Sequence, residues 1–182
     1  MKNAFEILGI HPGLVLSEET VRTAFRDAGK AAHPDAGGTD EQFAELRGAF
    51  EVLSSPSKRL KCWLDLRGTL AETRGTVDPQ LMDLFSEVGE VTQLAEAVIR
   101  KRDEAKSALG LALLERETQI RREAVEVALR RVEASIEREC AEFPKIESAV
   151  VLDVEAASKT ARNLAFLEKW RGGLRGVFSR LV

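Results

Sequence analysis

A polar, glycine-rich loop between two amphipathic segments constrains the fold of this chain more than any other feature. The loop covers residues 31–38 and reads AAHPDAGG. Pro34 cannot continue a helix and disfavours helical geometry at His33, so the preceding helix is predicted to end near Ala32. The two glycines that follow allow positive φ where the chain reverses. The loop is therefore predicted to be the tip of a helical hairpin that presents His33, Pro34 and Asp35 to a partner.

The segments on both sides of the loop have the apolar period of helices. Ser17 is a good N-cap for the first helix, and Thr39 with Gln42 three residues later has the pattern of a capping box for the second. Apolar residues at spacings of three and four should pack the two helices together. They are Val21, Ala24, Phe25 and Ala28 in the first helix and Phe43, Leu46, Ala49, Phe50 and Leu53 in the second.

A basic row occupies another face of the first helix. Arg22, Arg26 and Lys30 lie four residues apart, so they share one side of the helix. Taken alone, such a row indicates an ordinary solvated helix surface. Here the row leads directly to His33, Pro34 and Asp35, and one partner could contact both.

Residues 1–67 resemble a J-domain, because several segments around the loop match that family in order and spacing. This is the module by which DnaJ-type co-chaperones engage DnaK-type ATPase chaperones. The matching segments are residues 4–10 (AFEILGI), 20–26 (TVRTAFR), 33–35 (HPD), 43–46 (FAEL), 49–56 (AFEVLSSP) and 58–59 (KR).

The resemblance implies a chaperone-binding site. In J-domains the basic face of the second helix meets an acidic surface on the chaperone ATPase. The residues that match are Arg22, Arg26, Lys30, His33, Pro34 and Asp35. Asp27 stands where the family more often has a second basic residue, which implies a weaker electrostatic contact.

The second half of the chain is predicted to be a bundle of long helices. Residues 68–78 are the expected linker, and from Pro79 onward apolar residues follow helical spacing for long distances. With breaks near Gly110 and at Pro144, the economical prediction is three antiparallel helices near residues 79–109, 111–142 and 148–180. The predicted fold is therefore all-α, with a J-domain at 1–67 and a C-terminal three-helix bundle at 79–182. The alternative is an extended coiled coil with a second chain, whose seam would be lined by Arg130, Arg131, Glu133, Glu137 and Arg138.

A J-domain followed directly by an all-helical tail is similar to the HscB family. Proteins of that family pair with an HscA- or DnaK-type chaperone and deliver the scaffold protein on which iron–sulfur clusters are built. The resemblance implies a client-binding patch formed by Leu81, Met82, Phe85 and Phe166. The competing interpretation is that these four residues are bundle core.

Two features of the tail depart from the HscB pattern. Ser86 and Gly89 occupy positions where that family places acidic residues. The stretch between the two halves of the patch is also longer than is usual in the family. Both departures favour a different client as the alternative.

Composition excludes several other function classes. With 27 basic and 30 acidic residues the net charge is −3, and aromatic residues make up 5%, which argues against nucleic-acid binding. Cys62 and Cys140 are far apart and are expected to be reduced thiols rather than a disulfide or zinc site. No leader or membrane span is recognised, so a cytoplasmic protein without membrane contact is expected. The chain shows no phosphate loop, metal motif or serine nucleophile context, so neither an enzyme nor a bound cofactor or metal is expected.

The sequence thus predicts a co-chaperone that stimulates a DnaK/HscA-type ATPase and delivers a client, the iron–sulfur scaffold protein being the expected one. Two alternatives remain at this point. The chain could serve another client, or it could be a helical self-association protein with a vestigial J-domain. Both a monomer and a homodimer are compatible with the sequence.

Overall fold

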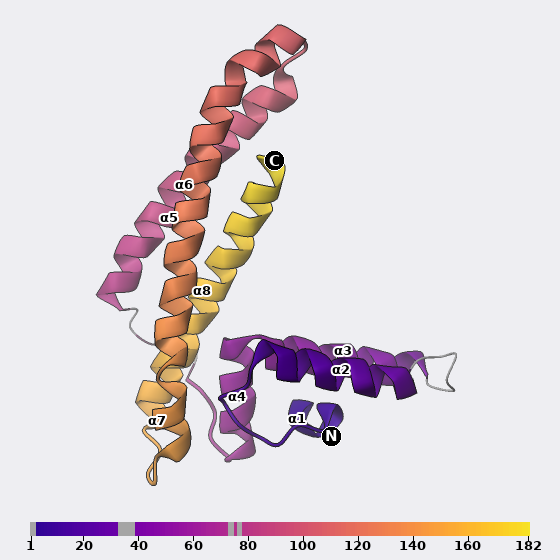
Figure 1. Cartoon of the computed structure of the whole chain (residues 1–182). Coiled ribbons are helices and arrows are strands. Elements are labelled where there is room, and N and C mark those ends of the chain that lie inside the picture. The colour runs from indigo at the N-terminus through magenta and orange to yellow at the C-terminus, as the bar shows by residue number, and fades with distance from the viewer. Residues whose placement is uncertain (1–2, 33–38, 73–74, 76–77) are drawn as a thin grey trace. The chain divides into compact units, whose positions relative to one another are not determined.

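In the computed structural model, residues 3–32, 39–72, 75 and 78–182 are described, and every regular element among them is an α-helix (Figure 1). The helices are α1 (Ala4–Leu8), α2 (Glu18–Ala32), α3 (Asp40–Ser54), α4 (Pro56–Leu66), α5 (Pro79–Glu104), α6 (Ala108–Cys140), α7 (Phe143–Ser148) and α8 (Val154–Arg180). Residue contacts divide the chain into two compact units. The first is Met1–Gly75 with Glu139–Ala165, and the second is Thr76–Arg138 with Phe166–Val182.

Side-chain caps define the helix ends of the first unit. The Ser17 Oγ accepts a hydrogen bond of 3.0 Å from the backbone N–H of Thr20 and so caps α2. Thr39 and Gln42 form the reciprocal capping box, with bonds of 3.1 and 3.2 Å. Both caps predicted from the sequence are confirmed. Ser55 ends α3 and also caps α4, its Oγ accepting from the N–H of Lys58 at 3.3 Å.

The helical hairpin of α2 and α3 is closed by aromatic rings and by a buried apolar layer. The Phe25 ring lies 4.6 Å from the Phe50 ring and 6.4 Å from the Phe43 ring, between ring centroids. α1 packs against α3, with the Phe5 side chain fully buried. The other large apolar residues that are fully or nearly fully buried in this part of the chain are Leu8, Leu14, Val21, Leu46, Leu53, Leu60, Trp63 and Leu64.

A short helix from later in the chain belongs to the first unit. The Glu147 carboxylate of α7 accepts a hydrogen bond of 3.2 Å from the backbone N–H of Leu14. The buried Arg59 of α4 lies with its guanidinium 5.6 Å from the centroid of the Phe143 ring and donates to the carbonyl of Leu53 at 3.0 Å. These contacts join α7 to the helices of the J-like segment.

The second unit is built from α5, α6 as far as Arg138 and α8 from Phe166 onward, which form the predicted antiparallel three-helix bundle (Figure 1). Ion pairs connect all three helices: Arg131 with Glu87, Arg175 with Glu133 at 2.8 Å, and Arg180 with Glu96 at 2.8 Å. Because these side chains are substantially exposed, their pairs contribute little stability. The buried apolar stripe supplies most of it, through Leu84, Val88, Ala95, Val98, Val125, Ala128, Val132, Leu174 and Val177.

The breaks between the long helices differ from the prediction. α5 ends at Glu104 and α6 begins at Ala108, so Gly110 lies inside α6 rather than at the break. The reason is local: the Ser107 Oγ accepts a hydrogen bond of 3.0 Å from the N–H of Gly110 and caps the new helix. Pro144 stands in the first turn of α7, where a proline is tolerated, so it starts a short helix that was not predicted.

None of the described helices is both long enough and apolar enough to cross a membrane. Among the described residues, Cys62 and Cys140 take part in no disulfide. The predicted division into J-domain, linker at 68–78 and bundle remains a prediction.

Candidate functional site

The basic row lies on the exposed side of α2, and its cations already have partners within the helix. The Arg22 guanidinium is 2.5 Å from the Glu18 carboxylate, and the Lys30 ammonium is 2.9 Å from the Asp27 carboxylate. Arg26 donates to the Thr23 hydroxyl at 3.3 Å. All these cations are exposed, so a partner surface can compete for them.

Asp27 partly neutralises this row. The hydrogen bond from Lys30, together with its positive charge, holds the pKa of the Asp27 carboxyl below its usual value. The carboxylate is therefore ionised at neutral pH and lowers the positive potential around Lys30 and Arg26.

An Asp27→Asn chain is expected to bind an acidic chaperone surface more tightly, because the substitution removes a negative charge from the row. The gain should be roughly fivefold or less at low salt and should shrink as salt rises. It should act mainly on the association rate, measured by surface plasmon resonance. Asp103→Asn, on the exposed side of α5, makes the same charge change away from the row and serves as the control. Equal gains for both variants would contradict a role for the row.

His33, Pro34 and Asp35 lie outside the described residues. The described helices on either side are α2, which ends at Ala32, and α3, which is capped by Thr39. The role of the three residues in chaperone binding stays a prediction.

The structure separates the four predicted client-binding residues into two groups. Leu81 is only 6% exposed and belongs to the bundle core. Met82 and Phe85 on α5 are each 51% exposed, and Phe166 on α8 is 41% exposed. Three of the four side chains thus lie on the surface, where a partner can reach them.

Trp170 on α8 contacts both exposed phenylalanine rings and joins them into one cluster. Trp170 is not among the site residues predicted from the sequence. The Trp170 ring centroid lies 5.6 Å from that of Phe85 and 6.3 Å from that of Phe166. The indole is half-buried between them. Its spacing of four residues from Phe166 places both rings on one side of α8, which is the signal that could have identified it. We call Met82, Phe85, Phe166 and Trp170 the aromatic cluster.

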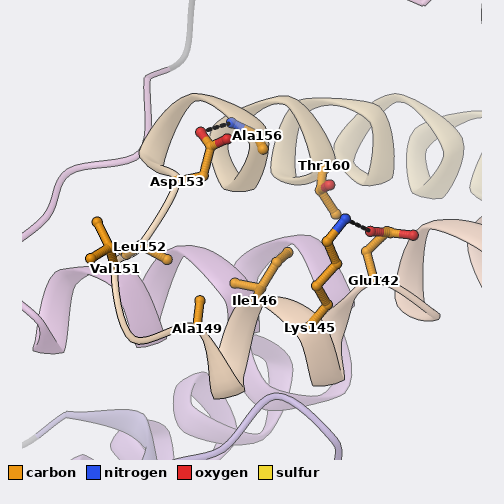
Figure 2. A pocket seen from close by; sticks show the side chains of 9 residues that line it. All are labelled: Glu142, Lys145, Ile146, Ala149, Val151, Leu152, Asp153, Ala156 and Thr160. Atoms are coloured by element: carbon orange, nitrogen blue, oxygen red, sulfur yellow. Dashed lines mark hydrogen bonds and ion pairs between the residues drawn. The ribbon is translucent and has the colours of Figure 1, made fainter.

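A small open pocket lies in the first unit, where α7 meets the start of α8 (Figure 2). Its volume is about 240 Å³. Figure 2 shows the ammonium of Lys145 beside the Glu142 carboxylate, 3.6 Å away, and the Asp153 carboxylate accepting from the N–H of Ala156 at 3.0 Å. None of the site residues predicted from the sequence lines this pocket.

Comparison with known proteins defines the class of the first segment. The DnaJ domain family matches residues 3–62. A DnaJ protein homolog of Cucumis sativus is 46% identical over 55 residues, which are 30% of this chain and 13% of that protein. The tetratricopeptide repeat and J domain-containing co-chaperone DNJ1 of Cryptococcus neoformans is 41% identical over 58 residues, 32% of this chain and 11% of that protein. The chain therefore carries a J-domain, and the matches span only a small part of these relatives.

The fold of the whole chain is similar to that of a particular J-domain chaperone. Chaperone HscB from Vibrio cholerae matches over 100% of both chains, with a TM-score of 0.58 and 22% sequence identity. The chain thus has the HscB fold, as the sequence predicted.

Proposed function

We propose that this protein is a co-chaperone that stimulates the ATPase of a DnaK/HscA-type chaperone and delivers the scaffold protein of iron–sulfur cluster assembly. The observation that carries the proposal is the combination, in one chain, of a DnaJ domain at residues 3–62 with the HscB fold. The chain is not itself the catalyst, because ATP is hydrolysed in the chaperone's active site.

Stimulation would work by differential binding. The basic row of α2 and the loop with His33, Pro34 and Asp35 would contact the chaperone best in the state that is ready to hydrolyse ATP. A ligand that prefers one state shifts the population toward it by its difference in affinity for the two states. The J-domain therefore raises the hydrolysis rate without supplying a reacting group.

Client delivery would use the aromatic cluster. Exposed large apolar side chains on a bundle otherwise rich in charge are typical of a binding surface. The flexible Met82 side chain beside rigid rings suits a protein partner, because methionine adapts to irregular surfaces. Leu81 is buried and is not part of this surface.

A Met82→Ala, Phe166→Ala double variant is expected to bind the scaffold protein about 10- to 100-fold more weakly, since two exposed anchors are lost. Its melting temperature should barely change, because both side chains are exposed. Isothermal titration of the full chain with purified scaffold protein measures the affinity, and differential scanning calorimetry measures the melting temperature.

Leu81→Ala is the matched contrast to the double variant. It should lower the free energy of unfolding by roughly 2–5 kcal/mol, because it removes a buried side chain. Unchanged scaffold binding by the double variant would show that the cluster is not the client site. No binding by the unaltered chain would mean that the client is a different protein.

A further inference from the structure

The side of α5 that carries the aromatic cluster is uncharged over several turns. Met82, Phe85, Ser86, Gly89 and Gln93 recur at spacings of three and four, and all are exposed. A chain with 31% charged residues would be expected to place charge on such a face.

The acidic residues of this part of α5 lie on a neighbouring face. Asp83, Glu87 and Glu90 are each one residue beyond a member of the uncharged row, about 100° around the helix. Glu87 is held by an ion pair with Arg131 of α6. The contact between the rings of Phe85 and Trp170 shows that the uncharged row borders α8 instead.

On α8 the same border is formed by Phe166, Trp170 and Gly173. The half-buried indole is the largest ring of the cluster and is the one that contacts both phenylalanines. A tryptophan held by its neighbours loses little conformational freedom on binding, and tryptophan is enriched among the residues that dominate interface energies. Gly89 and Gly173 are exposed, and a side-chain carbon added at either one would meet no atom within 4 Å.

We propose that Trp170 is the central anchor of the client surface and that this surface takes an uncharged, apolar segment of the client. The proposal rests on the proposed function, since it concerns the same site. An acidic client side chain placed on the uncharged row would lose its hydration close to the exposed carboxylates of Asp83 and Glu90, which is unfavourable. An aliphatic segment would cover Trp170 and the two phenylalanines at no such penalty.

The first test replaces the anchor. Trp170→Ala is expected to weaken binding of purified scaffold protein about 30-fold in isothermal titration, and Trp170→Phe about threefold to tenfold, because the smaller ring keeps part of the contact. Val127→Ala, an exposed apolar residue on α6, should leave the affinity unchanged. Trp170→Phe keeps the test valid if the alanine variant folds poorly, as circular dichroism would show.

Tryptophan fluorescence gives a second readout that a purely structural role would not change. Trp63 is the other tryptophan and is buried in the first unit. In a Trp63→Phe chain, emission therefore reports on Trp170 alone. Adding scaffold protein should shift this emission to shorter wavelength, because the half-exposed indole loses water.

The second test adds a negative charge to the uncharged row of α5. Gly89→Glu should weaken scaffold binding about tenfold or more, because the carboxylate would be buried against an apolar segment. Gly172→Glu makes the same change about 200° around α8 from Trp170 and should have no effect on binding. Binding by the unaltered chain should also change little between low and high salt.

The outcomes separate this inference from the proposed function. If Gly89→Glu binds the scaffold protein more tightly and in a salt-sensitive way, the client segment is basic, and the proposal that it is uncharged is wrong. If Trp170→Ala and Trp170→Phe both leave scaffold binding unchanged, Trp170 is not the anchor, while the proposed function stands. If the unaltered chain does not bind scaffold protein, the proposed client fails and this inference fails with it.

Discussion

A His33→Gln chain is expected to leave the chaperone ATPase at its unstimulated rate while binding the client as the unaltered chain does. Pro34 follows His33, and a proline restricts the backbone of the residue before it, so His33 is expected to act as part of the proposed docking loop. Glutamine keeps a polar side chain of similar length but lacks the imidazole ring. Steady-state ATP hydrolysis by the chaperone, measured with increasing full-length variant, gives the loss of stimulation.

The chain provides a matched control for this substitution. His11 is the other histidine of the sequence, and its Nδ1 lies 3.1 Å from the Pro12 carbonyl in an exposed loop. A His11→Gln chain should stimulate hydrolysis normally. Equal stimulation by the His33 variant and the unaltered chain would show that the J-domain does not act through its loop.

Phe5→Ala is expected to lower the stability of the first unit by about 3–5 kcal/mol, because it leaves a cavity where α1 packs on α3. The Phe5 side chain is 0% exposed. A loss of this size is comparable to the whole stability of many domains, so part of the protein should unfold at moderate temperature. Urea denaturation followed by circular dichroism measures the change.

Two other substitutions serve as controls for the stability loss expected of Phe5→Ala. Val15→Ala, at a position that is 64% exposed, should change the stability by less than about 0.5 kcal/mol. Phe5→Leu should cost less than Phe5→Ala, because leucine fills more of the space. If Phe5→Ala were as stable as the unaltered chain, α1 would not be part of the core.

Local chemistry explains why most helix boundaries could be predicted. Ser17, Thr39 and Gln42 act on backbone groups within three residues, so the sequence nearby is sufficient to identify the caps. The break before α6 lies ahead of Gly110 because a serine cap, and not the glycine, sets the start of the helix. Ser107 supplies the first hydrogen bond of that helix, and Gly110 continues it.

The proposed client surface was only partly predictable from the sequence, for a different reason. Helical spacing places Met82, Phe85 and Leu81 on neighbouring positions of α5, but it does not say which of them faces another helix. That depends on how α5 packs with α8, a contact between residues far apart in the sequence. Leu81 is consequently core, and Trp170 contacts Phe85, a residue far from it in the sequence.

The net positive charge that α2 offers to a partner was also only partly predictable from the sequence. The row of Arg22, Arg26 and Lys30 was evident from the sequence, as was the unusual Asp27. The structure adds that Glu18 and Asp27 each hold one cation of the row, so the surface offered to a partner is less positive than the row alone suggests.

The most direct test of the central claim is single-turnover ATP hydrolysis by the DnaK/HscA-type chaperone of the same organism, mixed with the full chain. The account predicts that hydrolysis accelerates and reaches a plateau as the concentration of the chain rises, and that the His33→Gln chain gives no acceleration at any concentration. A hydrolysis rate that the unaltered chain does not change, or that both chains raise equally, would contradict the account.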